Sequence, residues 1–383
     1  MPTLRHTYNF PTRIEYGPGA MKDLVVIIKR EGFKKGLIVT DEGIVKAGIA
    51  EILQKEFNSA GIDVVIFSRV KSNPIDANAY DGAKVYKESK SEFVVGLGGG
   101  SPIDTAKVVK CLATHDGPLE KYDDAKGGDK YIQNNMPPFY AIPTTAGTGS
   151  EVGRSSVITI QSTNKKTIIF SPYLMPTIAV LDPEVTVSLP PGLTAATGVD
   201  AFVHNLEAYL MDVFHPFADG IAREGIYRSF KYLPHAVENG NDIAARGEML
   251  MASAMGATAF QKGLGVNHSI AHALGVFYDT HHGLANAAVL VEVMKYNLKS
   301  LNVKQKLASL GPLLNTKSDA EAVINAIENW LISLNMPVNL KSFSIPAIDA
   351  QRIEDYALED PCCPLNPRKV EKGDVLKIIQ QLL

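Results

Sequence analysis

Apolar residues recur with two different periods along the chain: the two periods alternate in the first half, and the second half keeps the helical period. Up to about residue 185, short runs rich in Val, Ile and Phe alternate with amphipathic stretches, which predict strands and helices respectively. The expected strands cover residues 36–40, 63–67, 93–97, 138–142 and 177–181, and the expected helices include 47–60 and 78–89. Regular alternation of strand and helix favours an α/β domain with a parallel sheet covered on both faces.

The pattern changes at two proline-rich breaks. Pro183 and the pair Pro190-Pro191 interrupt the chain within a short stretch. Beyond them the pattern is helical almost to the end, and the expected helix 244–260 carries small residues that permit close helix packing. We therefore expect an α/β domain over residues 1–185 and an all-helical domain over residues 186–383.

Composition narrows the class of protein. The chain has 383 residues, of which 45% are hydrophobic and 21% are charged, as is typical of a soluble globular enzyme with two domains. A net charge of −3 without a long basic run argues against nucleic acid and against an anionic membrane surface. No apolar stretch approaches the roughly 20 residues that cross a bilayer, and residues 1–10 lack the apolar segment of a signal peptide. Three cysteines make no disulfide framework, so we expect a cytoplasmic protein.

Four residues on two widely separated segments have the pattern of one metal site. Asp200 and His204 are four apart and share one face of an expected helix. His268 and His282 lie in a segment that contains two further histidines among small and apolar residues. One carboxylate and three imidazoles suit iron, zinc or nickel. A lone histidine is more often a core or surface residue, and the clustering is what favours ligands here.

A glycine-rich turn over residues 98–101 (Gly-Gly-Gly-Ser) connects the expected strand 93–97 to the start of a helix. Glycines let the backbone approach a ligand closely, and a helix N-terminus attracts a pyrophosphate. Pro102 fits the first helical position. The run departs from the G-x-G-x-x-G fingerprint, so an ordinary tight turn between strand and helix is the alternative.

Two further strand ends carry polar residues. Asp41 follows the expected strand 36–40, where a carboxylate would bind a ribose diol and repel a 2′-phosphate, which favours NAD over NADP. The alternative is a helix N-cap. The loop 143–151 is dense in hydroxyls and glycine and could cradle a phosphate or the nicotinamide amide. Its alternative is a capping-box turn that uses Ser150.

Together these motifs resemble the iron-containing (group III) alcohol dehydrogenase family, which is related to glycerol dehydrogenase and dehydroquinate synthase. The resemblance runs over essentially the whole chain, and the combination Asp-x3-His with His-x3-His…His-Gly is highly specific. It implies a Rossmann-like dinucleotide-binding domain followed by a helical domain, as in dehydroquinate synthase. The matching positions are Asp41, Asn73-Pro74, residues 98–101, residues 144–151, Asp200 with His204, residues 268–283 and Asn366-Pro367-Arg368-Lys369.

The resemblance also implies roles for individual residues. Asp200, His204, His268 and His282 match the family's metal ligands, with Fe2+ as the expected ion and Zn2+ or Ni2+ as alternatives. The positions that match NAD contacts are Asp41, Asn73, Gly99, Gly100, Ser101, Asp104, Thr144, Thr145, Thr148, Lys166 and Leu181.

Two further histidines lie in the same segment as His268 and His282. His272 matches a histidine near the nicotinamide, and we expect it to be the catalytic proton relay. The alternative is a packed residue that orients a ligand. His281 is expected beside the site or at the surface.

Three positions depart from the family pattern. Ile75 follows Asn73-Pro74 where Thr is commoner, Ser155 stands where one type of relative has Asn, and Val276 follows Gly275 where Gly is usual. The second departure puts one nucleotide contact in doubt, and the third could reshape the substrate pocket.

The implied function is reversible hydride transfer between NAD and a small primary alcohol or diol, by a metal-dependent alcohol dehydrogenase. One alternative is a zinc enzyme like glycerol dehydrogenase or dehydroquinate synthase, although those relatives use three protein ligands. Another is an assembly protein without catalysis. A homodimer or larger homo-oligomer is expected, with residues 8–16 contributing. The sequence leaves open the physiological alcohol and the metal bound in the cell, for which availability often decides.

Overall fold

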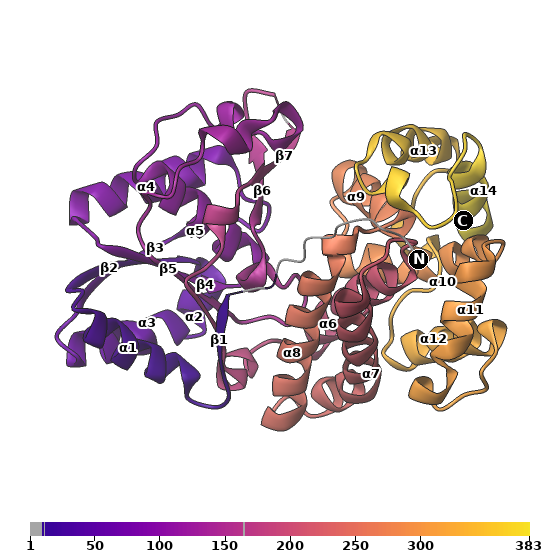
Figure 1. Cartoon of the computed structure of the whole chain (residues 1–383), viewed down its shortest axis with the longest axis horizontal. Coiled ribbons are helices and arrows are strands. Elements are labelled where there is room, and N and C mark those ends of the chain that lie inside the picture. The colour runs from indigo at the N-terminus through magenta and orange to yellow at the C-terminus, as the bar shows by residue number, and fades with distance from the viewer. Residues whose placement is uncertain (1–9, 11, 164) are drawn as a thin grey trace. The chain divides into compact units, whose positions relative to one another are not determined.

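The computed structural model describes residues 10, 12–163 and 165–383, so positions 8, 9 and 11 of the expected N-terminal contact segment lie outside the described residues. The chain forms two compact units. One comprises the chain up to Thr145 together with Gly149–Ser188, and the other comprises Ala146–Thr148 and Leu189–Leu383. Figure 1 shows the sheet of the first unit and the helices of the second.

The first unit is built on a six-stranded sheet in which every neighbouring pair is parallel. The order β1-β8-β5-β4-β2-β3 reverses at β2, because the chain passes to β3 on one side and returns to β4 on the other. Ligands of such sheets bind at the carboxyl ends of the strands beside the reversal. The strands are β1 (Arg13–Tyr16), β2 (Lys35–Asp41), β3 (Asp63–Val70), β4 (Phe93–Gly98), β5 (Phe139–Pro143) and β8 (Ile178–Leu181).

Helices cover both faces of this sheet, as the alternation of strand and helix predicts (Figure 1). Side chains of β2 alternate between the two faces: Ile38 packs with α1 and α3, and Leu37 and Val39 pack with α4 and α5. The expected α/β class is therefore confirmed. The helices of this unit are α1 (Ala20–Glu31), α2 (Glu42–Lys46), α3 (Ile49–Ser59), α4 (Asp76–Ser89) and α5 (Gly100–Leu112).

An antiparallel hairpin was not predicted. It pairs β6 (Ser155–Ile160) with β7 (Lys165–Phe170) outside the main sheet. Its strands mix exposed polar residues with buried ones, and β7 begins with two lysines. Ser156 and Thr167 are buried whereas their neighbours Val157 and Ile168 are exposed, so the apolar residues do not mark one face of each strand.

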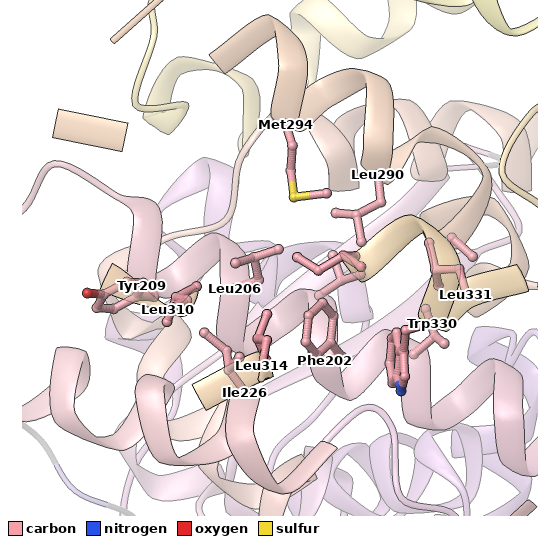
Figure 2. Packing of buried hydrophobic residues seen from close by; sticks show 14 of the residues in the cluster. Phe202, Leu206, Tyr209, Ile226, Leu290, Met294, Leu310, Leu314, Trp330 and Leu331 are labelled. Atoms are coloured by element: carbon pink, nitrogen blue, oxygen red, sulfur yellow. The ribbon is translucent and has the colours of Figure 1, made fainter. Parts of the chain in front are cut away.

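The regular secondary structure described in the second unit is all helical, as expected. None of the described helices is both long and apolar enough to span a membrane. Figure 2 shows Phe202 and Leu206 of α6 within the apolar core, near Leu290 and Met294 of α10. The helices are α6 (Pro191–Leu210), α7 (Pro216–Glu238), α8 (Ile243–Ala259), α9 (Val266–Tyr278), α10 (His282–Asn297), α11 (Leu301–Ser309), α12 (Ala320–Ser333), α13 (Ala350–Glu359) and α14 (Asp374–Leu382).

Helix α6 is buried on all sides and nevertheless contains ionisable residues. Asp200, His204 and Glu207 are each at most 5% exposed. A buried charge is costly unless it is paired or bound to a cation. The three residues lie at positions i, i+4 and i+7, so they share one face of the helix. That face forms the candidate site.

Candidate active site

Four side-chain donor atoms converge in the helical unit. The Nε2 atoms of His204 and His268 each lie 3.8 Å from Asp200 Oδ1, and His282 Nε2 lies 3.5 Å from the same oxygen. These separations are too long for good hydrogen bonds. In a tetrahedral site with bonds of about 2.1 Å, neighbouring ligand atoms are roughly 3.4 Å apart. The donor set therefore fits a divalent cation held between the four residues.

Three helices supply these donors. Asp200 and His204 stand one turn apart on α6, His268 lies in the first turn of α9, and His282 is the first residue of α10. Gly283 permits the approach of α10 to α6, because a Cβ there would lie 2.0 Å from the carbonyl oxygen of Ala196. The His282 side chain is 39% exposed, whereas those of the other three are at most 7% exposed, so solvent reaches the cluster beside His282.

The protonation states suit metal binding. Burial by itself would raise the pKa of Asp200, but the three imidazoles and the amide of Asn286 outweigh it and lower that pKa to about 2. Burial lowers the pKa of His268 well below its usual range and the pKa of His282 to about 3. A charged carboxylate at Asp200 beside neutral rings at His268 and His282 is the form in which these side chains bind a cation.

A second layer of side chains holds the donors in place. His268 Nδ1 lies 2.5 Å from Glu207 Oε2, and Glu207 Oε1 accepts a hydrogen bond of 3.1 Å from the backbone N–H of Asn267. Asn286 Nδ2 donates to Asp200 Oδ1 at 2.7 Å. Such partners fix the ring orientation of a histidine ligand.

Sequence reasoning missed both of these partners, although their spacing offered a signal. Glu207 follows His204 by three residues on α6, and Asn286 follows His282 by four residues on α10. Residues three or four apart share a helix face.

The two other histidines of this segment occupy different surroundings. The His272 ring stacks on the His282 ring, with centroids 5.4 Å apart and an interplanar angle of 15°. His272 Nδ1 lies 2.8 Å from Asp360 Oδ2. His281 is exposed and directly precedes α10, and it is not among the four converging donors.

Part of the predicted nucleotide residues, among them Asp41, Gly99 and Thr144, gather at the carboxyl ends of β2, β4 and β5. Asp41 ends β2 and also caps α2, since its Oδ1 accepts a hydrogen bond of 3.0 Å from Ile44 N. Its Oδ2 lies 3.6 Å from the place where a Cβ on Gly98 would stand. The cap thus uses one carboxylate oxygen, and the other lies beside the glycine turn.

The glycine turn has the expected form with one correction. Gly98 has φ +143°, a conformation that few other residues adopt. Helix α5 begins at Gly100 and not at Pro102, because Gly99 is extended and acts as the N-cap. Pro102 is thus the third helical residue, still in the first turn, where a missing N–H breaks no helical hydrogen bond. The remaining N–H groups of this turn suit an anion.

The loop that follows β5 borders this turn. Thr144 N donates to Gly98 O at 3.0 Å, and Thr145 Oγ1 lies 3.2 Å from the place of a Cβ on Gly99. The turn and the loop thus lie beside Asp41 at one edge of the sheet.

The other predicted nucleotide residues are more dispersed. Ser101 Oγ donates to Ser72 O at 2.5 Å, next to Asn73, and Lys166 Nζ lies 3.4 Å from Asn73 Oδ1. Leu181 is buried at the end of β8. Thr148 groups with the second compact unit.

Asp104 holds the 143–151 loop together. Its Oδ1 accepts from the Ser150 hydroxyl, and its Oδ2 accepts from Val157 N at 2.9 Å. The buried Lys107 donates to Ser150 Oγ at 2.8 Å. The capping box with Ser150 is not formed, because Gly149 occupies the N-cap of the short helix that follows. Both carboxylate oxygens of Asp104, a residue of α5, thus accept hydrogen bonds, one from this loop and one from β6.

Comparison with known proteins identifies the family. The family model "Iron-containing alcohol dehydrogenase" matches residues 11–183, and the model "Fe-containing alcohol dehydrogenase family, C-terminal" matches residues 194–383. These two matches cover nearly the whole chain. The chain belongs to the iron-containing alcohol dehydrogenase family.

Individual relatives match over their full lengths. The chain is 36% identical to 4-hydroxybutyrate dehydrogenase of Cupriavidus necator, covering 97% of this chain and 98% of that protein. It is 35% identical to NAD-dependent methanol dehydrogenase of Bacillus methanolicus, covering 96% and 97%. A crystal structure of 1,3-propanediol oxidoreductase superposes with a TM-score of 0.93 at 34% identity, covering 99% of this chain and all of that one.

Proposed function

We propose that this protein is a metal-dependent, NAD-linked alcohol dehydrogenase that interconverts small primary alcohols or diols with the corresponding aldehydes. The convergence of one carboxylate and three imidazoles on a single point carries this proposal. The names of the relatives support the substrate class, because methanol, 1,3-propanediol and 4-hydroxybutyrate all carry a hydroxyl on a terminal carbon.

The proposed metal ligands are Asp200, His204, His268 and His282, and ferrous iron is the proposed ion. A divalent cation bound there would lower the pKa of the alcohol hydroxyl and polarise the aldehyde carbonyl. The carboxylate of Asp200 leaves one net positive charge at the site. The half-exposed edge beside His282 is the side from which a small substrate can enter. A fourth proposed ligand distinguishes this site from that of zinc enzymes like glycerol dehydrogenase or dehydroquinate synthase, which use three protein ligands.

The proposed nucleotide is NAD, which accepts the hydride. Asp41 would bind the ribose diol through Oδ2, and the first-turn N–H groups of α5 would bind the pyrophosphate. The other proposed contacts are Asn73, Gly99, Gly100, Ser101, Thr144, Thr145, Thr148, Lys166 and Leu181. Asp104 is a further proposed contact, and its hydrogen bonds to Ser150 and Val157 also shape the 143–151 loop.

The test is NADH oxidation with a panel of short-chain aldehydes, beside dihydroxyacetone, the product of glycerol oxidation, as a separate substrate. We expect turnover with aldehydes that strongly exceeds turnover with dihydroxyacetone. Turnover confined to dihydroxyacetone would instead support a glycerol dehydrogenase. NADH binding without turnover of any substrate would support an assembly protein.

A further inference from the structure

A buried carboxylate from the C-terminal part of the chain reaches the histidine beside the metal centre. Asp360 directly follows α13 and is 9% exposed. Its Oδ2 lies 2.8 Å from His272 Nδ1. Its Oδ1 accepts from Ser269 Oγ at 3.2 Å and from Cys362 N at 2.9 Å, and the Cys362 thiol also hydrogen-bonds this carboxylate. The carboxylate is therefore held from several directions.

These contacts constrain His272 in two ways. A carboxylate can only accept hydrogen bonds, so the imidazole must carry a hydrogen on Nδ1, and the lone pair of the neutral ring is then on Nε2. The plane of the ring is set separately, because it stacks on His282 and stands edge-on to His268, with centroids 6.0 Å apart at 69°. Tautomer and orientation are thus both determined by neighbouring residues.

We propose that Asp360 is a positioning residue that holds His272 in the Nδ1–H tautomer and in one orientation beside the metal centre. Asp360 acts only through His272, and Ser269 and Cys362 in turn hold Asp360. The proposal rests on the proposed alcohol dehydrogenase function and on the role expected for His272 from the family resemblance, a proton relay. Its Nε2 would be the nitrogen that exchanges a proton with the substrate hydroxyl.

A second cation is the competing interpretation of the same three side chains. His272, Asp360 and Cys362 offer nitrogen, oxygen and sulfur atoms within 4.8 Å of one another. One observation favours positioning: the carboxylate already accepts hydrogen bonds at both oxygens.

A double-mutant cycle in kcat tests the coupling. Asp360→Asn should lower kcat by about 10- to 100-fold in the wild-type background, as loss of such partners typically does. In a His272→Gln background the same substitution should change kcat less than about twofold, because the residue through which Asp360 acts is gone. Equal losses in the two backgrounds would show a merely structural role and overturn the proposal.

The chain offers a matched control. Asp349 precedes α13 and accepts a hydrogen bond of 2.6 Å from Tyr278 at the end of α9, so it also joins these two elements. Asp349→Asn should leave kcat unchanged. A loss equal to that of Asp360→Asn would mean that any loosening between α9 and α13 suffices, and would contradict the proposal.

Two readouts do not depend on turnover. In protein labelled with 15N-histidine, the His272 signals should show a hydrogen on Nδ1 in the wild type and lose that signature in Asp360→Asn. An unchanged tautomer would overturn the proposal even if kcat fell.

Asp360→Asn should also retain the wild-type zinc content after titration with zinc. Loss of one of two bound equivalents would establish the second cation site instead. If the wild-type enzyme fails to turn over alcohols, the proposed function fails, and the tautomer still decides the role of Asp360.

Discussion

The two candidate sites of this protein are built from different parts of the chain. The metal centre consists of side chains: one carboxylate and three imidazoles from α6, α9 and α10, most of them buried. The candidate nucleotide region combines the backbone of the turn through Gly98 and Gly99 and the first N–H groups of α5 with many dispersed side chains. A site made of four side chains is lost when one is removed. A site that spreads its contacts over backbone and many side chains should lose only part of its affinity with each single substitution.

The two regions also differ in how their charged side chains are surrounded. At the metal centre, burial alone would raise the pKa of Asp200, but the imidazoles outweigh it and lower that pKa to about 2. The nucleotide region instead keeps a polar surface whose side chains hydrogen-bond the backbone, as Asp41 and Ser101 do. The comparison predicts a steep loss of function at the first site and graded changes at the second.

The largest effect is expected from His268→Ala. Removing a buried ligand should abolish metal retention and turnover and leave NADH binding largely intact. Metal content by mass spectrometry and NADH binding by fluorescence test this. His281→Ala is the control, since His281 is exposed and does not join the cluster, and it should retain the metal. Near-normal metal content in His268→Ala would refute the ligand assignment.

A smaller loss of metal binding is expected from Glu207→Gln. The substitution replaces the carboxylate that holds His268 Nδ1 by a neutral amide and so weakens that hydrogen bond. Metal affinity should fall by about 10- to 100-fold, measured by competition with a chelator. Glu354→Gln is the matched control, because Glu354 is equally buried but accepts hydrogen bonds from Gly373 and Leu376. Equal affinities in the Glu207→Gln variant and the wild type would mean that His268 is oriented by packing alone.

A graded effect is expected from Asp41→Ser. Serine keeps the N-cap of α2 and removes the charge that repels a 2′-phosphate. The ratio of kcat/KM with NADP to that with NAD should rise by about tenfold, equivalent to about 1.4 kcal/mol. Glu42→Gln, which neutralises the neighbouring exposed carboxylate, should leave the ratio unchanged. An unaltered preference in Asp41→Ser would mean that Asp41 is only a cap.

The smallest expected effect is on stability, and it distinguishes the role of Asp41 as an N-cap from its proposed role in binding the ribose. Asp41→Ala removes the hydrogen bond to Ile44 N that Asp41→Ser can keep. Urea unfolding should therefore find the alanine variant less stable than the serine variant by about 1 kcal/mol. If the two variants are equally stable, the capping bond contributes nothing measurable.

The fold class could be predicted because the apolar pattern differs between the two units. Buried strands such as β4 are nearly continuous apolar runs, and helices such as α3 repeat with the helical period. The hairpin β6–β7 could not be predicted, because it is held by pairing between two partly polar strands.

The candidate site was predictable to the extent that its residues are close in sequence. The spacing of Asp200 and His204 indicates a shared helix face, and spacings of three and four residues could likewise have indicated Glu207 and Asn286. Asp360 offered no such signal, because it meets His272 across 88 positions of the chain. The convergence of α6, α9 and α10 likewise depends on tertiary packing. That the four donors hold a metal stays a prediction.

One titration tests the central claim most directly. Metal-free protein is titrated anaerobically with ferrous iron, and NADH oxidation with a short-chain aldehyde is followed at each addition. The four-residue centre predicts that turnover rises linearly and saturates at one iron per chain in the wild type, with no rise in Asp200→Asn. Full turnover in metal-free protein, or saturation at one iron in the variant as well, would contradict it.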